Sequence, residues 1–168
     1  MKEKERDAKL KHFRKLWKLT TLLYTSHYRI IAIGRIRRWW IQEGINLYLR
    51  RLPGLTITEL RGSTLSKEAE GIMATFNNRG ILTALAEEGE TLTSKAFAQR
   101  LVSYESQRLT FLIGGAEGLS PKIKAKAQWK LSLSPMTLPH ELARLMLVEQ
   151  LFRAQSIIQN SPYHRSVN

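Results

Sequence analysis

A strand, a glycine loop and a helix start follow one another in residues 109–121 (LTFLIGGAEGLSP), and this unit limits the possible folds most strongly. The run Thr110–Ile113 is apolar and partly β-branched, which predicts a buried strand. Gly114 and Gly115 end it, and Ser120-Pro121 supplies an N-cap and a first helical residue. This arrangement is typical of the ligand-binding edge of an α/β sheet. Its glycine spacing differs from the dinucleotide-binding fingerprint, so a plain turn is an equal alternative on spacing alone.

Short apolar runs alternate with helical patterns along the rest of the chain. The predicted strands are residues 29–33, 55–60, 81–86, 110–113 and 131–134. The predicted helices are residues 39–52, 66–76, 93–103, 122–128 and 140–159. Residues 87–89 (EEG) are interpreted as the break that ends the third strand. This order predicts an α/β fold with a mostly parallel sheet and helices on both faces.

The last predicted helix, residues 140–159, is long and carries apolar side chains on more than one stripe. Such a helix is either deeply buried or shared with a second subunit. A two-fold symmetric homodimer is the simplest arrangement that shares it.

The charge of the chain is unevenly distributed. The net charge is +13, and residues 1–51 hold 14 Lys/Arg against 4 Asp/Glu. A basic half favours a polyanionic partner, RNA or DNA before a membrane surface. The length of 168 residues and the hydrophobic content of 43% suit one globular domain, and no apolar run is long enough to span a bilayer. The absence of cysteine suits a reducing, cytoplasmic location.

Residues 1–27 differ in composition from the rest of the chain, because charged residues are frequent in them. We expect them to be a basic, flexible leader before a single domain at 28–168. Three interpretations stay open for the leader. It is a floppy extension, an RNA-contacting arm, or a basic amphipathic helix on a membrane surface.

Four blocks of sequence carry a resemblance. They are LIGGxEG at 112–118, LSPMTLPH at 133–140, EQLFRA at 149–154 and PYHR at 162–165. Together they resemble the RlmH-type 23S rRNA pseudouridine N3-methyltransferases of the SPOUT superfamily, over about residues 29–165. The chain departs from that family in its leader and in a short segment at 62–80.

The resemblance implies a C-terminal trefoil knot, a homodimer and S-adenosylmethionine as methyl donor, with no metal. It also implies a substrate in the helix 69 loop of 23S rRNA, in the large subunit or the assembled ribosome. Three loops are then expected to bind the donor. Their residues are Leu85, Gly114, Gly115, Leu133, Ser134, Pro135, Met136, Thr137 and Leu138.

The same resemblance points to the tail for catalysis, because the N3 proton must be removed or the developing anion stabilised. His164 is the candidate base, Arg165 the partner of a phosphate or oxyanion, and Tyr163 the residue that orients the base. His140 either lines the pocket or caps its helix. Arg153 is expected to pair with a carboxylate such as Glu149 or Glu117.

The acids at 87–88 either bond ribose hydroxyls or are solvated. Two alternative functions remain at this stage. One is a SPOUT methyltransferase of another RNA. The other is a non-catalytic RNA-binding protein, held by phosphate contacts from Arg35, Arg37, Arg38, Arg50 and Arg51.

Overall fold

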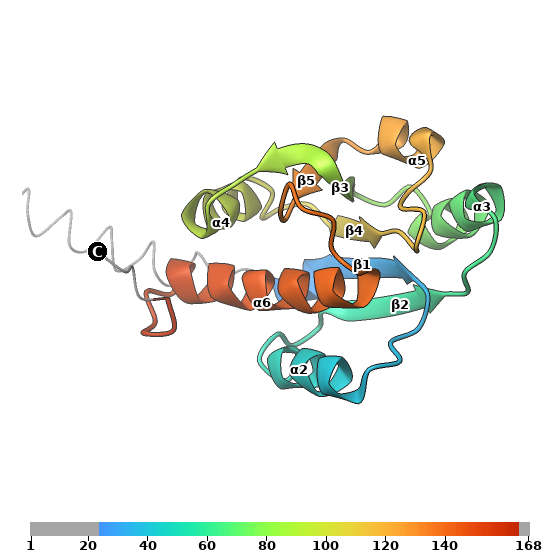
Figure 1. Ribbon diagram of the computed structural model, residues 1–168. Helices are drawn as coiled ribbons and strands as arrows, with labels where there is room; N and C mark the ends of the chain where they lie inside the picture. The colour runs from blue at the N-terminus through green and yellow to red at the C-terminus, as the bar shows by residue number, and fades with distance from the viewer. Residues whose placement is uncertain (1–23, 165–168) are drawn as a thin grey trace, which may run out of the picture.

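The computed structural model describes residues 24–164, so most of the predicted leader and Arg165 lie outside the described residues. After a short 3₁₀ turn, η1 (Thr25–His27), strands and helices alternate (Figure 1). The strands are β1 (Tyr28–Ile33), β2 (Thr56–Leu60), β3 (Ile81–Thr91), β4 (Leu109–Ile113) and β5 (Trp129–Ser132). The helices are α2 (Trp39–Leu49), α3 (Leu65–Phe76), α4 (Ser94–Ser103), α5 (Pro121–Lys126) and α6 (His140–Ile158).

The five strands form one sheet in the order β2-β1-β4-β3-β5, and every pairing within it is parallel. Helices cover both faces of the sheet. The helices α2, α4 and α6 pack on one face, and α3 and α5 pack on the other. The predicted α/β class with a mostly parallel sheet is therefore confirmed.

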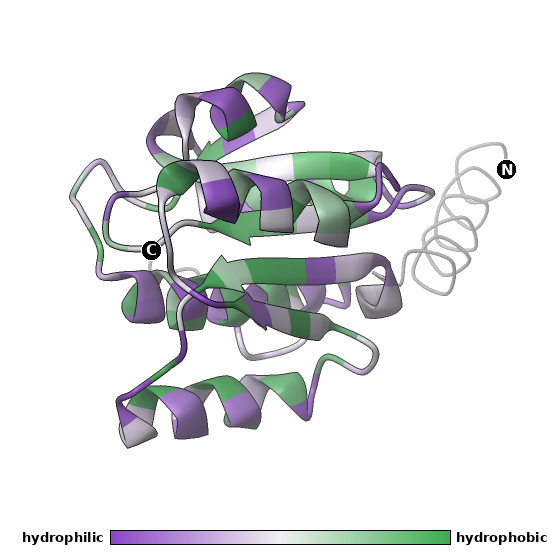
Figure 2. Ribbon diagram, turned by 90° about the vertical axis from the view of Figure 1, so that its right-hand side faces the viewer, coloured by the Kyte–Doolittle hydropathy of each residue, from purple (hydrophilic) through white to green (hydrophobic). Residues whose placement is uncertain are grey.

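Alternation along the strands explains the two layers of core. Ile30 and Ala32 of β1 face the α6 side, whereas Ile31 and Ile33 face the α3 side. In Figure 2 the central strands are largely green, as expected for a sheet buried on both faces. All five residues of β4 are buried, which places this strand at the centre of the molecule.

Local capping follows the sequence. The Ser120 hydroxyl accepts the Ile123 N–H at 3.3 Å, and Pro121 opens α5, as predicted. The Thr93 hydroxyl accepts the Ala96 N–H at 3.1 Å and starts α4. The start predicted for α3 at Ser66 is one residue late, because Thr64 is the N-cap.

The prediction that residues 87–89 end the third strand is wrong, since β3 continues to Thr91. Leu131 of β5 pairs with both Leu85 and Glu90, so the four residues between them form a bulge. A Cβ on Gly89 would lie 2.7 Å from the carbonyl carbon of Leu131. Glycine at this position therefore lets the two backbones approach closely.

Among the described helices, none is both long and apolar enough to cross a membrane.

Candidate functional site

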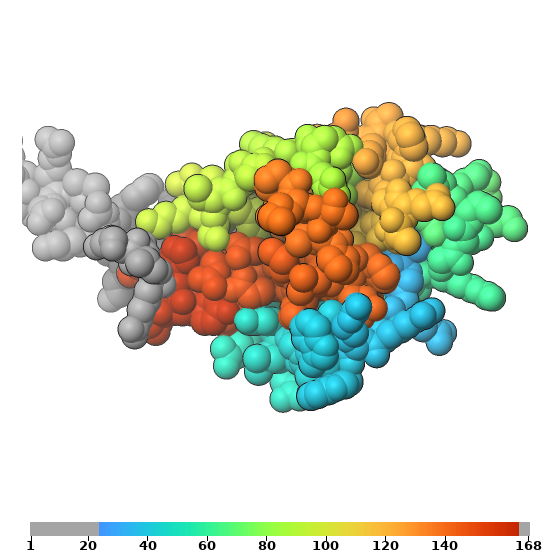
Figure 3. Space-filling view, viewed as in Figure 1, coloured from blue at the N-terminus to red at the C-terminus, as the bar shows by residue number. Residues whose placement is uncertain are grey.

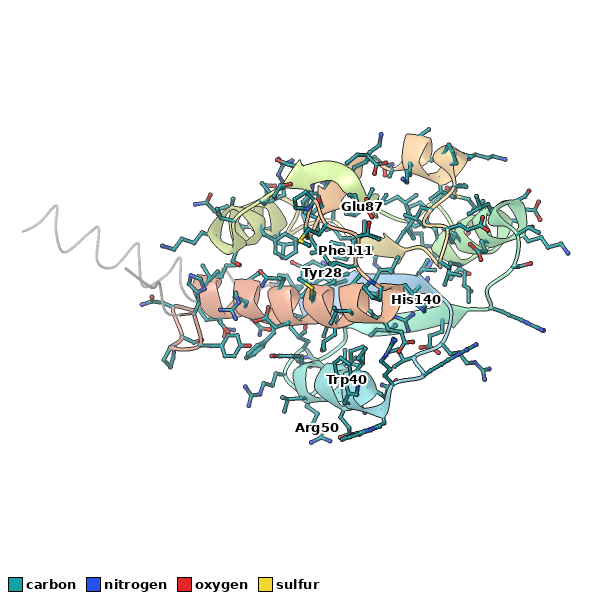
Figure 4. The ribbon with its side chains drawn as sticks, viewed as in Figure 1. Tyr28, Trp40, Arg50, Glu87, Phe111 and His140 are labelled. Atoms are coloured by element: carbon teal, nitrogen blue, oxygen red, sulfur yellow. The ribbon has the colours of Figure 1, made fainter. Side chains whose placement is uncertain are left out.

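A cavity of about 340 Å³ opens beyond the carboxyl ends of β4 and β5, next to the bulge of β3. This is the edge at which open parallel sheets bind ligands, and the volume is in the range of small-molecule sites. Figure 4 shows Glu87 on β3 and His140 at the start of α6, two of its lining residues. The lining residues are Leu85, Ala86, Glu87, Glu88, Ile113, Gly114, Gly115, Ala116, Glu117, Gly118, Leu119, Lys124, Leu133, Ser134, Met136, Leu138, His140 and Ala143.

The structure brings the three predicted loops together around this cavity. Seven of the nine residues expected to bind the donor line it: Leu85, Gly114, Gly115, Leu133, Ser134, Met136 and Leu138. Pro135 and Thr137 lie in the same loop but do not line the cavity. The cavity also takes in Ala143 of α6, which was not among the residues predicted from the sequence, because the packing of α6 on the sheet brings it there.

The glycine loop is folded too tightly for a side chain at its first position. A Cβ on Gly114 would lie 2.3 Å from the carbonyl carbon of Gly118, a distance that no real Cβ adopts. The Gly118 N–H donates to the carbonyl oxygen of Gly115 at 3.1 Å and closes the turn. Gly118 itself has φ +73°, which favours glycine.

Gly115 and Gly118 differ in what their missing side chains would meet. A Cβ on Gly115 would point to Ile33, 3.1 Å away, and to Glu68, 3.7 Å away, and neither residue lines the cavity. A side chain there would push the loop away from β1 and would not fill the cavity. A Cβ on Gly118 would meet nothing within 4 Å.

Charged side chains surround the cavity. The Lys124 ammonium donates to the Glu88 carboxylate at 2.8 Å, and this hydrogen bond is the main reason that the pKa of Glu88 is lowered. Of the two predicted acids, Glu88 is therefore bound to α5. Glu87 and Glu117 also line the cavity.

The first turn of α6 holds the segment between β1 and α2. The Glu141 carboxylate accepts the backbone N–H groups of Arg37 and Arg38, both at 3.1 Å. Burial acts to raise the pKa of Glu141, but these two N–H groups and the charge of Arg38 outweigh it and lower that pKa. Glu141 is only 4% exposed.

One turn further along α6, the Arg144 side chain is fully buried. It donates to the Gly34 carbonyl oxygen at 2.9 Å and to the Glu59 carboxylate at 2.6 Å. Neither Glu141 nor Arg144 was predicted from the sequence as a functional residue. The available signal was two charges three residues apart within a strongly apolar helix.

His140 contributes to the cavity and does not cap its helix, because Pro139 occupies the N-cap position. A Cβ on Gly34 would lie 3.3 Å from Nε2 of His140. The imidazole therefore lies between the cavity and the end of β1.

The tail is anchored on the side of α6. The Tyr163 hydroxyl donates to the Glu149 carboxylate at 3.0 Å and lies 3.1 Å from the Tyr48 hydroxyl. Its ring meets Phe152 edge to face at 4.6 Å between centroids, and the Arg153 guanidinium lies 4.9 Å from its centroid. Burial, followed by the bond with Tyr48 and the charge of Glu149, raises the pKa of Tyr163. The predicted pairing of Arg153 with Glu149 is confirmed.

The tail and the cavity of one chain lie apart. Glu149, which holds Tyr163, is nine residues from His140, or about 13 Å along the axis of α6. The Nδ1 atom of His164 is buried and has no hydrogen-bond partner among residues 24–164. Tyr163 and His164 are thus not brought to the cavity of their own chain.

Comparison with known families identifies the fold. The family model described as "Predicted SPOUT methyltransferase" matches residues 27–164, a span that contains the cavity and both described tail residues. The chain belongs to the SPOUT methyltransferase family. The family predicted from the four sequence blocks is thereby confirmed.

Similar proteins of known sequence or structure are also named as methyltransferases or methylases. A protein of Synechococcus sp. (strain CC9605) named "Ribosomal RNA large subunit methyltransferase H" is 64% identical over 138 residues, 82% of this chain and 96% of that protein. A protein of the same name from Synechococcus sp. (strain CC9902) is 62% identical over 84% of this chain and 98% of its own length. A probable methylase family protein from Haemophilus influenzae Rd KW20 shares the fold at 14% identity, with a TM-score of 0.60 over 84% of this chain and 72% of that one.

Proposed function

We propose that this chain transfers a methyl group from S-adenosylmethionine to N3 of a pseudouridine in 23S rRNA, in the helix 69 loop. The observation that carries the proposal is the cavity, in which the three predicted loops of a SPOUT methyltransferase meet. The names of relatives that match over 96% and 98% of their length support rRNA as the substrate.

The cavity suits the proposed donor. Its glycine loop leaves no room for a Cβ at Gly114, so the main chain itself forms the wall. Apolar side chains at Leu85, Leu133 and Leu138 provide a surface for an adenine ring, and Glu87 provides an acceptor for ribose hydroxyls. When bound, S-adenosylmethionine supplies an electrophilic methyl group on a sulfonium.

The chain has to position the nucleobase and remove the proton from its N3 atom. We assign these tasks to the tail, with His164 as the base and Arg165 as the partner of a phosphate or of the developing anion. Tyr163 stays protonated because its pKa is raised, so it serves as a donor and an anchor and not as a base.

A homodimer explains how a tail reaches a cavity. Trp40 and Leu47 of α2, both 49% exposed, lie one above the other on the helix beside α6. Leu145 of α6 packs against α2 at Gly44, where a Cβ would lie 3.0 Å from its side chain, and both Leu145 and Met146 are half-buried. Figure 3 shows α6 and the loop before it above α2 on one face. A two-fold contact on this face, with antiparallel α6 helices, brings the partner's His164 toward the cavity.

Membership of the family supports the proposal of a trefoil knot in the C-terminal part of the sheet. An rRNA substrate supports the proposal of a cytoplasmic location. Among the described residues, no three His, Asp or Glu side chains are grouped to hold a metal ion.

The test is transfer of labelled methyl from S-adenosylmethionine to ribosomes that lack the modification, followed by mass spectrometry of the nucleosides. Free large subunits and assembled ribosomes are compared side by side. We expect label on N3 of a pseudouridine. Label in another RNA would reassign the substrate within the family. Donor binding without transfer to any RNA, or no donor binding at all, would reject the proposal and favour the non-catalytic RNA-binding protein.

A further inference from the structure

The five arginines predicted as candidate phosphate contacts form two separate groups in the structure. Arg35, Arg37 and Arg38 lie between β1 and α2, next to the start of α6. Arg50 and Arg51 lie at the opposite end of α2, which is labelled at Arg50 in Figure 4. The helix between the two groups is about 16 Å long. Only the first group lies next to a cavity-lining residue, because a Cβ on Gly34, which directly precedes Arg35, would lie 3.3 Å from Nε2 of His140.

The backbone of this first group is fixed beside His140, and we call this segment, residues 34–38, the rim, although none of its residues lines the cavity itself. The Gly34 N–H donates to the Leu60 carbonyl oxygen at 2.8 Å, and the Gly34 carbonyl oxygen accepts from Arg144. The Glu141 carboxylate accepts the N–H groups of Arg37 and Arg38. All these contacts come from β2 and from the helix that begins with His140, a residue of the cavity wall.

The side chains of the segment point outward while its backbone is held. Arg35 and Arg37 are exposed, and neither has an acidic partner among residues 24–164. The Arg38 side chain is 54% exposed and reaches Glu141 only at 3.5 Å. Trp39 follows directly and is 76% exposed. Exposed arginines beside an exposed aromatic ring are the composition of surfaces that bind single-stranded RNA.

We propose that Arg35 and Arg37, with Arg38 beside them, bind backbone phosphates of the RNA next to the target nucleotide. The proposal rests on the proposed function, because it names the surface by which the same site holds its substrate. A guanidinium fits a phosphate in a bidentate way and stays charged at every physiological pH. A rigid backbone lowers the entropy lost when those side chains bind. Glu141 and Arg144 are then positioning residues for this surface.

The test compares two double variants of equal charge. Arg35→Gln with Arg37→Gln removes the rim charges but leaves Arg38 and its contact with Glu141. Arg79→Gln with Arg108→Gln is the control. Both control residues are exposed, and they precede β3 and β4, at the edge of the sheet opposite the cavity.

Binding to a 23S rRNA fragment is measured over a series of salt concentrations, separately from methyl transfer. The rim variant is expected to bind at least tenfold more weakly and to lower the slope of log K against log salt by about 1.4, about 0.7 for each lost phosphate contact. The KM for the ribosomal substrate should rise by a similar factor, with kcat at saturation and the affinity for S-adenosylmethionine unchanged. The control variant should keep the wild-type slope and KM.

Two results would overturn the proposal. One is a rim variant that keeps the salt slope and the KM of the wild type, measured on a substrate that the wild-type protein does methylate. The other is a rim variant that loses affinity for S-adenosylmethionine, because the segment would then shape the cavity and not bind RNA. If the wild type binds the fragment but methylates nothing, the proposed function fails, while the binding series still decides which surface holds RNA.

Discussion

The Tyr163 hydroxyl donates to the carboxylate of Glu149 at 3.0 Å, so the tail is tied to the middle of α6. Two of the sequence blocks, EQLFRA and PYHR, are therefore one structural unit. Glu149 also receives the Arg153 guanidinium, and Phe152 packs against the Tyr163 ring. Through the hydrogen bond between Tyr163 and Glu149, the EQLFRA block sets the position of the PYHR block.

Tyr163→Phe should lower turnover about tenfold and leave the affinity for S-adenosylmethionine unchanged. It removes two hydroxyl hydrogen bonds, each with a net contribution of about 1 kcal/mol, but keeps the ring on Phe152. Glu149→Gln should act on the same unit, so the double variant should be little worse than Glu149→Gln alone. Steady-state kinetics on the three variants checks this. Additive losses would mean that Tyr163 acts on the substrate directly.

Gly114→Ala should abolish binding of S-adenosylmethionine, because the new Cβ would overlap the backbone of Gly118 and open the loop. Gly118→Ala is the matched control. Its Cβ meets no protein atom within 4 Å, so the loop itself is opposed only by the strain of a positive φ, about 1 kcal/mol, although Gly118 also lines the cavity. Calorimetry should show a loss of affinity for the first variant and a smaller change for the second. Equal affinities would mean that the donor does not bind at this loop.

His164→Ala should lower kcat about a hundredfold or more, since general base catalysis contributes at least that factor. Donor affinity should stay near that of the wild type because the proposed role of His164 is to take the N3 proton of the nucleobase and not to hold the donor. Single-turnover kinetics with saturating donor separates the chemical step from binding. Unchanged kcat would remove His164 from the mechanism.

Glu141 should make stability depend on pH in the acid range. Its pKa in the folded state is below the ordinary value of 4.5, so its ionised form stabilises the fold above that pH. This contribution is lost as the pH falls through the lower, folded-state pKa. Glu141→Gln should cost about 2 kcal/mol at pH 7 and progressively less below pH 4. Urea unfolding at a series of pH values measures the difference in the free energy of unfolding between the wild type and this variant. A difference as large at pH 3 as at pH 7 would contradict the prediction.

Trp40→Glu should convert a dimer into a monomer in sedimentation experiments, because it places a charge in the centre of the proposed contact face on α2 and α6. Trp39→Glu is the control for oligomeric state, since the adjacent side chain points about 100° away around the helix. If both variants sediment as the wild type does, the contact face lies elsewhere.

Several features could be predicted from local pattern alone. The five strands, the five α-helices and the Ser120-Pro121 helix start follow from apolar periodicity and capping, which act between residues close in the chain. The glycine loop was located in the same way, whereas the loop at 133–138 was expected to bind the donor only from the family resemblance. Their meeting in one cavity follows from a parallel sheet, whose strands all end at the same edge.

Only the tertiary structure determined the features that depend on contacts between residues far apart in the chain. The β3 bulge arises because Leu131 of β5 pairs on both sides of residues 86–89. The direction of Gly115 toward Ile33, and the clamp of Glu141 and Arg144 on residues 34–38, join segments that are 80 to 110 positions apart. The sequence by itself specified the elements and their family, because each is a local pattern. The separation of the tail from its own cavity follows from the length of α6 and from the hydrogen bond that folds Tyr163 back onto it.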